Sequence, residues 1–144
     1  MKTVKDLLQL KGHEYWWVEP GTPVLDALNM MAEKNVGALL VLESGTLVGV
    51  LSERDYARKV ILKGKSSKDT PAKEIMSDNV ARVMLDSSVE ECMELMTERR
   101  IRHLPVMENQ NIVGVISIGD VVKAIISDQE FIIEQLDHYV HGNQ

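Results

Sequence analysis

The chain repeats itself at a spacing of 65 residues. Without a gap, residues 22–61 align with residues 87–126, and the identical pairs include Gly49/Gly114, Ser52/Ser117 and Asp55/Asp120. Chance rarely keeps so many pairs in one register, so the two stretches are copies of one structural unit. A chain of 144 residues suits one compact, duplicated domain with an ordinary hydrophobic core.

Each copy shows the same order of predicted elements, β-α-β-β-α. Val24, Ala27, Leu28 and Met31 follow helical spacing, and the same spacing recurs from Val89. Thr22 and Ser87 are expected to cap these helices, with Pro23 at the first helical position. The apolar strands that follow are expected at residues 38–42, 47–51, 103–107 and 112–116, with turns at Ser44-Gly45 and residues 109–111.

This pattern predicts a mixed α/β (α+β) fold with a C-terminal helix. Ser52 and Ser117 are expected to cap the last helix of each copy, and residues 131–140 to form a further helix with an apolar face. The expected boundaries are repeat one at residues 3–64, a polar linker at 65–73, repeat two at 74–127, and the C-terminal helix and tail at 128–144.

Composition excludes several classes of protein. The net charge of −6 disfavours nonspecific nucleic-acid binding, which needs a basic face. No apolar run approaches the roughly 20 residues of a membrane span, so no membrane partner is expected. The single cysteine, Cys92, cannot form an internal disulfide or a cysteine-based metal site, and its helical position favours core packing. We therefore expect a cytoplasmic protein that holds no metal.

The most informative motif is Gly, two apolar residues, Ser, two variable residues and Asp. It occurs as GVLSERD (Gly49–Asp55) and as GVISIGD (Gly114–Asp120), each time where a strand leads into a helix. Free N–H groups and the positive dipole of a helix start attract an anion such as a phosphate. The aspartate in the first turn can accept hydrogen bonds from vicinal hydroxyls, as on a ribose. The alternative is that each serine–aspartate pair is only a helix cap.

The two copies resemble a tandem pair of cystathionine β-synthase (CBS) domains, as found in stand-alone proteins of bacteria and plant organelles. The strings SERDYARKVILKGKSS (52–67), RIRHLPV (100–106) and VGVISIGDVVKAI (113–125) carry the resemblance, which extends over residues 3–127. It implies two repeats packed about a pseudo-twofold axis, with two clefts that each use both copies. It also implies adenosine ligands, chiefly AMP, ADP, ATP, NAD or S-adenosylmethionine.

The resemblance implies a set of residues for each cleft. In site A, Asp120 would hold the ribose, Ser117, Arg102 and His103 would approach the phosphate, and copy one would line the adenine end. The full set for site A is Lys11, Trp16, Val36, Gly37, Ala38, Arg102, His103, Pro105, Ser117, Ile118, Gly119 and Asp120. The set for site B is Ser52, Arg54, Asp55, Arg58, Ala81 and Ile101. Trp16 could instead be a core residue, and Arg102 and His103 part of a solvated turn.

The two clefts are not expected to be equal. Gly37 and Ala38 occupy the positions of Arg102 and His103, so only site A carries its own phosphate-binding charges. AMP is therefore expected at site A, while Arg54 and Arg58 at site B would suit a dinucleotide such as NAD.

These observations together predict a homodimeric regulatory module that senses an adenosine nucleotide and signals to a partner protein. No Walker loop, GxGxxG motif or nucleophile elbow occurs, so we do not expect an enzyme. Two alternatives stay open: a protein-interaction module whose clefts are vestigial, and a nucleic-acid binder that uses the linker lysines.

Overall fold

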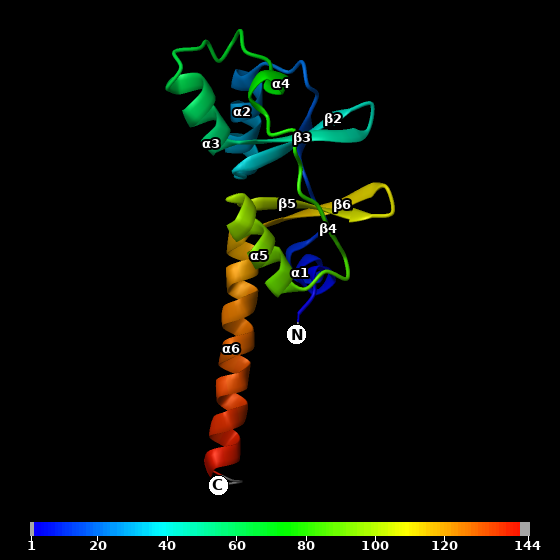
Figure 1. Ribbon diagram of the computed structural model, residues 1–144, viewed down its shortest axis with the longest axis vertical. Helices are drawn as coiled ribbons and strands as arrows, with labels where there is room; N and C mark the ends of the chain where they lie inside the picture. The colour runs from blue at the N-terminus through cyan, green and yellow to red at the C-terminus, as the bar shows by residue number, and fades with distance from the viewer. Residues whose placement is uncertain (1, 142–144) are drawn as a thin grey trace. The chain divides into compact units, whose positions relative to one another are not determined.

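Each copy of the repeat forms a three-stranded sheet in the computed structural model, which describes residues 2–141 (Figure 1). In the first, β1 (Trp17–Val18) pairs parallel with β2 (Ala38–Glu43), which pairs antiparallel with β3 (Thr46–Ser52). The second repeats this order with β4 (Val83–Met84), β5 (His103–Glu108) and β6 (Asn111–Ser117). The expected central strands are confirmed, each extended by one or two residues.

The turn in the first hairpin forms where the sequence predicted it. Ser44 and Gly45 have φ values of 52° and 80°, and positive φ at both central residues of a two-residue loop matches the right-handed twist of the strands. In the second hairpin, Asn109 takes a φ of 59° in the same place. Asparagine and glycine tolerate this backbone region, so the local sequence selects the hairpin.

The helix between the first two strands of each sheet buries one face in its own core. In α2 (Val24–Lys34) the buried residues are Val24, Ala27 and Met31, and in α5 (Val89–Arg99) they are Val89, Cys92 and Met96. The predicted apolar stripes and the core position of Cys92 are thus confirmed.

The expected caps of these two helices were wrong by one residue. Pro23, rather than Thr22, is the N-cap of α2, and it makes no side-chain cap bond. Ser88, rather than Ser87, caps α5, because its hydroxyl accepts a 3.0 Å hydrogen bond from the backbone N–H of Glu91. The Ser87 hydroxyl instead accepts from the backbone N–H of Met84, which holds the turn after β4.

The last helix differs between the copies. After β3 the chain forms a short helix, α3 (Glu53–Tyr56), that continues as a π-helical turn, η1 (Ala57–Ile61). After β6 it forms one 24-residue helix, α6 (Ile118–His141). The two helices expected after Ser117 are therefore one continuous helix, and residues 142–144 of the expected tail lie outside the described residues. No helix among residues 2–141 is both long and apolar enough to span a membrane.

The segment that precedes each sheet packs with the sheet of the other copy. The chain divides into two compact units: residues 15–80 form one, and residues 2–14 join residues 81–141 in the other. We call these the first unit and the second unit. Helix α1 (Val4–Lys11) thus belongs to the second unit, and α4 (Ala72–Ile75) to the first. Each compact unit therefore contains the sheet of one repeat and the short helix that precedes the sheet of the other repeat.

Close packing at one glycine of each sheet shows why the exchanged helices fit. Leu8 of α1 is fully buried, and a Cβ atom built on Gly114 of β6 would lie 2.8 Å from its Cδ2 atom. In the first unit, a Cβ atom on Gly49 of β3 would lie within 3 Å of the side chain of Met76, which follows α4. Each glycine of the repeated motif therefore makes room for an exchanged helix.

Candidate functional site

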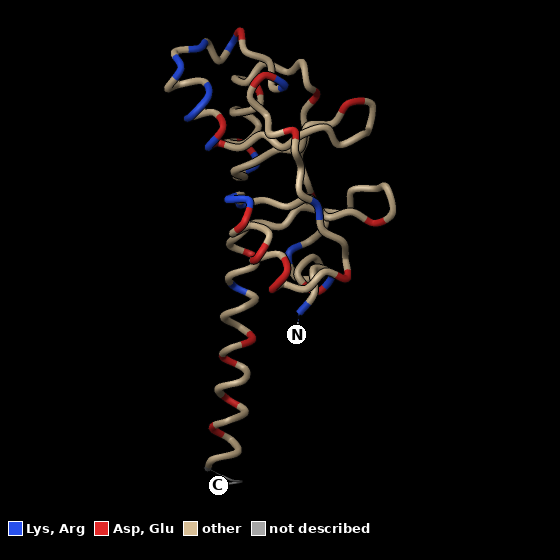
Figure 2. The backbone as a smooth tube through the Cα atoms, viewed as in Figure 1, with Lys and Arg blue, Asp and Glu red and all other residues tan. Residues whose placement is uncertain are grey.

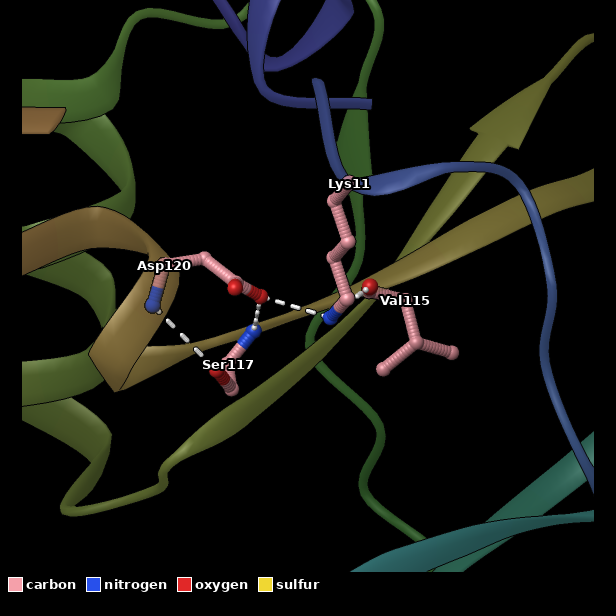
Figure 3. A network of polar contacts seen from close by, with 4 residues as sticks. All are labelled: Lys11, Val115, Ser117 and Asp120. Carbon is pink, nitrogen blue, oxygen red and sulfur yellow. Dashed lines mark hydrogen bonds and ion pairs between the residues drawn. The ribbon is translucent and has the colours of Figure 1, made fainter. Parts of the chain in front are cut away.

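The junction between β6 and α6 is the centre of the candidate site in the second unit. Ser117 ends the strand, and its backbone N–H donates a 2.7 Å hydrogen bond to Oδ2 of Asp120 (Figure 3). The backbone N–H of Asp120 donates in return to the Ser117 hydroxyl, at 3.3 Å. This reciprocal capping box holds the carboxylate in the first turn of α6.

Lys11, the last residue of α1, reaches the same carboxylate. Its Nζ atom lies 2.6 Å from Oδ2 of Asp120 and donates a second bond, of 2.8 Å, to the carbonyl oxygen of Val115 on β6 (Figure 3). Two fixed acceptors hold the ammonium group in one place. The exchange of α1 therefore delivers a cation to an aspartate that lies 109 positions further along the sequence.

Asp120 is an ionised carboxylate at neutral pH. Partial burial alone would raise its pKa, but the bonds from Lys11 and from the Ser117 backbone outweigh burial and hold the pKa below the ordinary value. An ionised carboxylate only accepts hydrogen bonds, so the junction presents an acceptor to any group that approaches it.

Arg102 and His103 lie at the start of β5, next to this junction. The backbone carbonyl of Arg102 accepts a 2.9 Å hydrogen bond from the N–H of Ile118, and His103 pairs with Ser117 across the β5–β6 ladder. Burial is the main cause that lowers the pKa of His103, and the nearby Lys11 lowers it further. His103 is therefore neutral at pH 7, whereas Arg102 and Lys11 are the cations beside it.

The corresponding junction in the first unit repeats this geometry. The backbone N–H of Ser52 donates to Oδ2 of Asp55 at 2.9 Å, and the Asp55 N–H donates to the Ser52 hydroxyl at 3.1 Å. The N–H of Glu53 donates to the carbonyl of Gly37, as Ile118 does to Arg102 in the second unit. The predicted caps at both serines are thus confirmed. We call these two equivalent strand-to-helix junctions the Asp55 corner (residues 52–55) and the Asp120 corner (residues 117–120).

The lysine that pairs with each aspartate comes from a different element. Asp55 pairs with Lys59, one helical turn away, at 3.3 Å, and Lys59 also donates a 2.9 Å bond to the carbonyl of Ile75 in α4. The repeat alignment places Ala124, a core residue, opposite Lys59, so the second unit takes its cation from Lys11 instead. Sequence reasoning missed Lys59, although its i, i+4 spacing from Asp55 is a visible signal.

The predicted residues of site A divide between the two units. Lys11, Ser117 and Asp120 are bonded together, and Ile118 and His103 adjoin them through the backbone. The members in the second unit are Lys11, Arg102, His103, Pro105, Ser117, Ile118, Gly119 and Asp120, and those in the first are Trp16, Val36, Gly37 and Ala38. Trp16 packs against the core of the first unit, and Nζ of Lys34 lies 4.5 Å from the centroid of its ring.

The predicted residues of site B divide in the same way. Ser52, Arg54, Asp55 and Arg58 lie in the first unit, at and after its corner, whereas Ala81 and Ile101 lie in the second. Ala81 is a buried core residue, and Ile101 packs against the same core. Within residues 2–141, no group of three or more His, Cys, Asp and Glu side chains is placed to hold a metal ion.

Comparisons with known proteins agree with this architecture. A family model described as CBS domain matches residues 3–62 and again residues 72–127. The mitochondrial CBS domain-containing protein CBSX3 of Arabidopsis thaliana is 37% identical, over 97% of this chain and 72% of its own length. The crystal structure of the CBS domain protein NE2398 matches with a TM-score of 0.83 and 50% identity, over 87% of this chain and 98% of that one.

A more distant structure shares the fold. The CBS domain pair of protein MJ0100, solved in complex with 5′-methylthioadenosine and S-adenosyl-L-methionine, matches with a TM-score of 0.78. The match covers 89% of this chain and 98% of that one. At 22% identity it shows a common fold and no more.

Proposed function

The chain belongs to the CBS domain family, and from this premise we propose that it is a regulatory module that binds an adenosine nucleotide. AMP is our first choice of ligand, before ADP, ATP, NAD or S-adenosylmethionine. The observation that carries the proposal is the junction at Asp120, where an ionised carboxylate, a lysine and a helix start converge. The adenosine compounds bound to the CBS pair of MJ0100 support the choice of ligand class.

We assign the ribose to Asp120. Oδ2 of this carboxylate already accepts bonds from the Ser117 backbone and from Lys11. We assign Oδ1, which neither of these bonds uses, to the vicinal hydroxyls of the sugar. The two existing bonds fix the side chain before a ligand arrives, so binding costs little further ordering of this group.

We assign the phosphate to the first turn of α6 and to Arg102. The start of a 24-residue helix carries a partial positive charge, and the Ser117 hydroxyl lies at the same point. Because His103 is neutral at pH 7, it would supply a hydrogen bond rather than a charge. Arg102 would then supply the full charge for the phosphate, because the nearby Lys11 is already paired with Asp120.

The corner at Asp55 is proposed as the weaker second site. Its carboxylate uses Oδ2 for the cap and Oδ1 for Lys59, so both oxygens are already engaged. A ribose would have to compete for one of them. Gly37 and Ala38 supply no charge where the second unit has Arg102 and His103, so this corner suits a ligand that draws on Arg54 or Arg58, such as NAD.

The wider role follows from the family and stays a proposal. We expect a cytoplasmic homodimer that is regulatory rather than enzymatic, and that changes its interaction with a partner protein when the nucleotide binds. A ligand can shift such an equilibrium only by its difference in affinity for the two states, so the partner must distinguish them.

Isothermal titration calorimetry with AMP tests the ribose assignment. Asp120→Asn keeps an oxygen that can accept from the Ser117 backbone but removes the charge. A hydrogen bond to a charged group contributes about 1.5–3 kcal/mol, so we expect affinity to fall about 10- to 100-fold. Asp55→Asn is the matched control and should leave this affinity unchanged. Equal AMP affinity in wild type and Asp120→Asn would refute the assignment.

The rival function, an interaction module with vestigial sites, predicts a different result. We would extract the purified protein with acid and analyse the extract by mass spectrometry for adenine compounds. We would also measure thermal shifts with AMP, ATP, NAD and S-adenosylmethionine. A retained adenine compound or a stabilising shift supports a sensor, and the absence of both favours the rival.

A further inference from the structure

The second half of α6 carries a large apolar surface that its own unit does not cover. The C-terminal half of the helix extends past α1 and α5 of the second unit (Figure 1). Five of its large side chains, all on one side of the helix, are between 55% and 85% exposed: Ile132, Ile133, Leu136, Tyr139 and Val140. We call these five residues the α6 stripe. Monomeric proteins rarely expose so much contiguous apolar surface, so this surface needs a partner.

The stripe continues a buried row of the same helix. Ile125 packs against the core of the second unit, and Ile132 and Tyr139 follow it at intervals of seven residues. Val122, Gln129 and Leu136 form the neighbouring row with the same interval. Alternating steps of three and four residues between these rows define the seam of a coiled coil or helical bundle.

A third row widens this seam. Ile126, Ile133 and Val140 lie one position after the Ile125 row, and all three are exposed. Three apolar positions in every seven are typical of helices packed in a bundle rather than of a minimal two-helix seam. The geometry therefore fits a second apolar helix surface of similar width.

The area of the stripe is sufficient for a stable dimer. If a large side chain presents roughly 150–200 Å² when free, five side chains at these exposures present on the order of 500–700 Å² per chain. Pairing two stripes would bury roughly 1,000–1,400 Å², which clears the roughly 1,000 Å² expected of a specific interface.

The charges along α6 argue against anionic partners. After Lys123 the sequence contains no Lys or Arg, whereas Asp128, Glu130, Glu134 and Asp137 line the helix (Figure 2). Binding to anionic phospholipid surfaces and to nucleic acids relies on basic residues beside the contact face. Of the acidic residues, Glu130, Glu134 and Asp137 lie away from the three apolar rows, so they would stay in solvent when two stripes meet.

We propose that the α6 stripe is a self-association surface that packs against the same stripe of a second copy of this chain. The second copy supplies an apolar helix of equal length and width, with Glu130, Glu134 and Asp137 on the far side. The proposal names the interface of the expected homodimer, and it does not depend on which nucleotide the protein binds.

Sedimentation velocity and light scattering of the full chain test the proposal. Ile132→Glu with Leu136→Glu places two charges in the seam while retaining good helix formers. We expect the dissociation constant to rise at least 100-fold, so the measured mass at tens of micromolar falls from that of a dimer toward half that value. The matched control, Glu130→Gln with Glu134→Gln, changes two charges on the opposite face and should keep the wild-type mass.

Folding is checked separately, because neither substituted residue belongs to the core clusters. Circular dichroism and AMP affinity should therefore persist in the Ile132→Glu, Leu136→Glu variant. A monomeric wild-type chain, or a variant with the wild-type mass, would overturn the proposal. A monomeric wild type that floats with phosphatidylcholine vesicles would assign the stripe to a lipid surface instead, which also overturns it.

Discussion

Replacing Gly114 with alanine tests whether α1 packs on the sheet of the second repeat. The new Cβ atom would lie 2.8 Å from Cδ2 and 3.1 Å from Cδ1 of Leu8, which is closer than unstrained carbon atoms approach. Leu8 is fully buried and has little room to retreat. Overpacking of this kind costs about 1–3 kcal/mol, and we expect the free energy of unfolding to fall by that amount.

A double-mutant cycle separates this contact from a general loss of stability. Leu8→Ala alone leaves a cavity and should cost about 2–5 kcal/mol. In the double variant the methyl group introduced by Gly114→Ala no longer meets the leucine and fills part of the cavity. The combined loss should therefore be smaller than the sum of the two single losses by about 1–2 kcal/mol, as for residues in contact.

The first unit provides the matched control. Gly49→Ala would meet Met76, so Gly49→Ala and Met76→Ala should couple in the same way. For the crossed pairs, Gly114 with Met76 and Gly49 with Leu8, the changes in unfolding free energy should be additive. Urea unfolding followed by circular dichroism gives the four cycles, and fluorescence of Trp16 and Trp17 reports on the first unit separately.

The crossed pairs decide the result. If each exchanged helix instead packed on the sheet of its own repeat, Gly49 would couple with Leu8 and Gly114 with Met76. That outcome would refute the segment exchange, and with it the placement of Lys11 beside Asp120.

Three further measurements follow from the described side chains. The pKa of Asp120 is lowered by Lys11 and Ser117 against the effect of burial, so the stability that the carboxylate contributes is complete at neutral pH and is lost as the pH falls below about 4. The difference in unfolding free energy between wild type and Asp120→Asn should therefore shrink from pH 7 to pH 3, and a constant difference would contradict this. Burial raises the pKa of the Cys92 thiol to about 11, so a thiol reagent at pH 8 should react only as the protein unfolds, and rapid labelling of the native state would disprove it. Ser88→Ala should lower the unfolding free energy by about 1 kcal/mol in urea titrations, since it removes the cap of α5, and an unchanged midpoint would show that the cap contributes nothing.

The sequence predicted the local parts of this fold well because their causes are local. The hairpin at Ser44-Gly45 requires residues that tolerate positive φ, and the corners at Ser52 and Ser117 require a cap. Each cause lies within four residues of its effect. The confirmed family resemblance rests on these same segments, since they contain the repeated motif.

The segment exchange could not be predicted in this way. Lys5-Asp6-Leu7-Leu8 resembles Lys73-Glu74-Ile75-Met76, so either segment has the residues to pack on either sheet. The choice depends on backbone bonds such as that from the Val4 N–H to the Ser87 carbonyl, at 2.9 Å, which link distant parts of the chain. Contacts between such distant segments leave no periodic signal in one sequence.

The segment exchange adds a second difference between the Asp55 corner and the Asp120 corner. In both units a lysine links the aspartate of the repeated motif to the exchanged helix. The two units differ in whether the lysine belongs to the exchanged helix or to the segment that carries the aspartate. Lys11 lies on the exchanged helix and reaches Asp120, whereas Lys59 follows Asp55 and reaches the carbonyl of Ile75 on the exchanged helix. Because the Asp55–Lys59 pair spans one helical turn, it does not require α4 to be docked. The Asp120–Lys11 pair requires α1 to be docked, so the Asp120 corner is the one whose ion pair depends on how the two repeats exchange their segments.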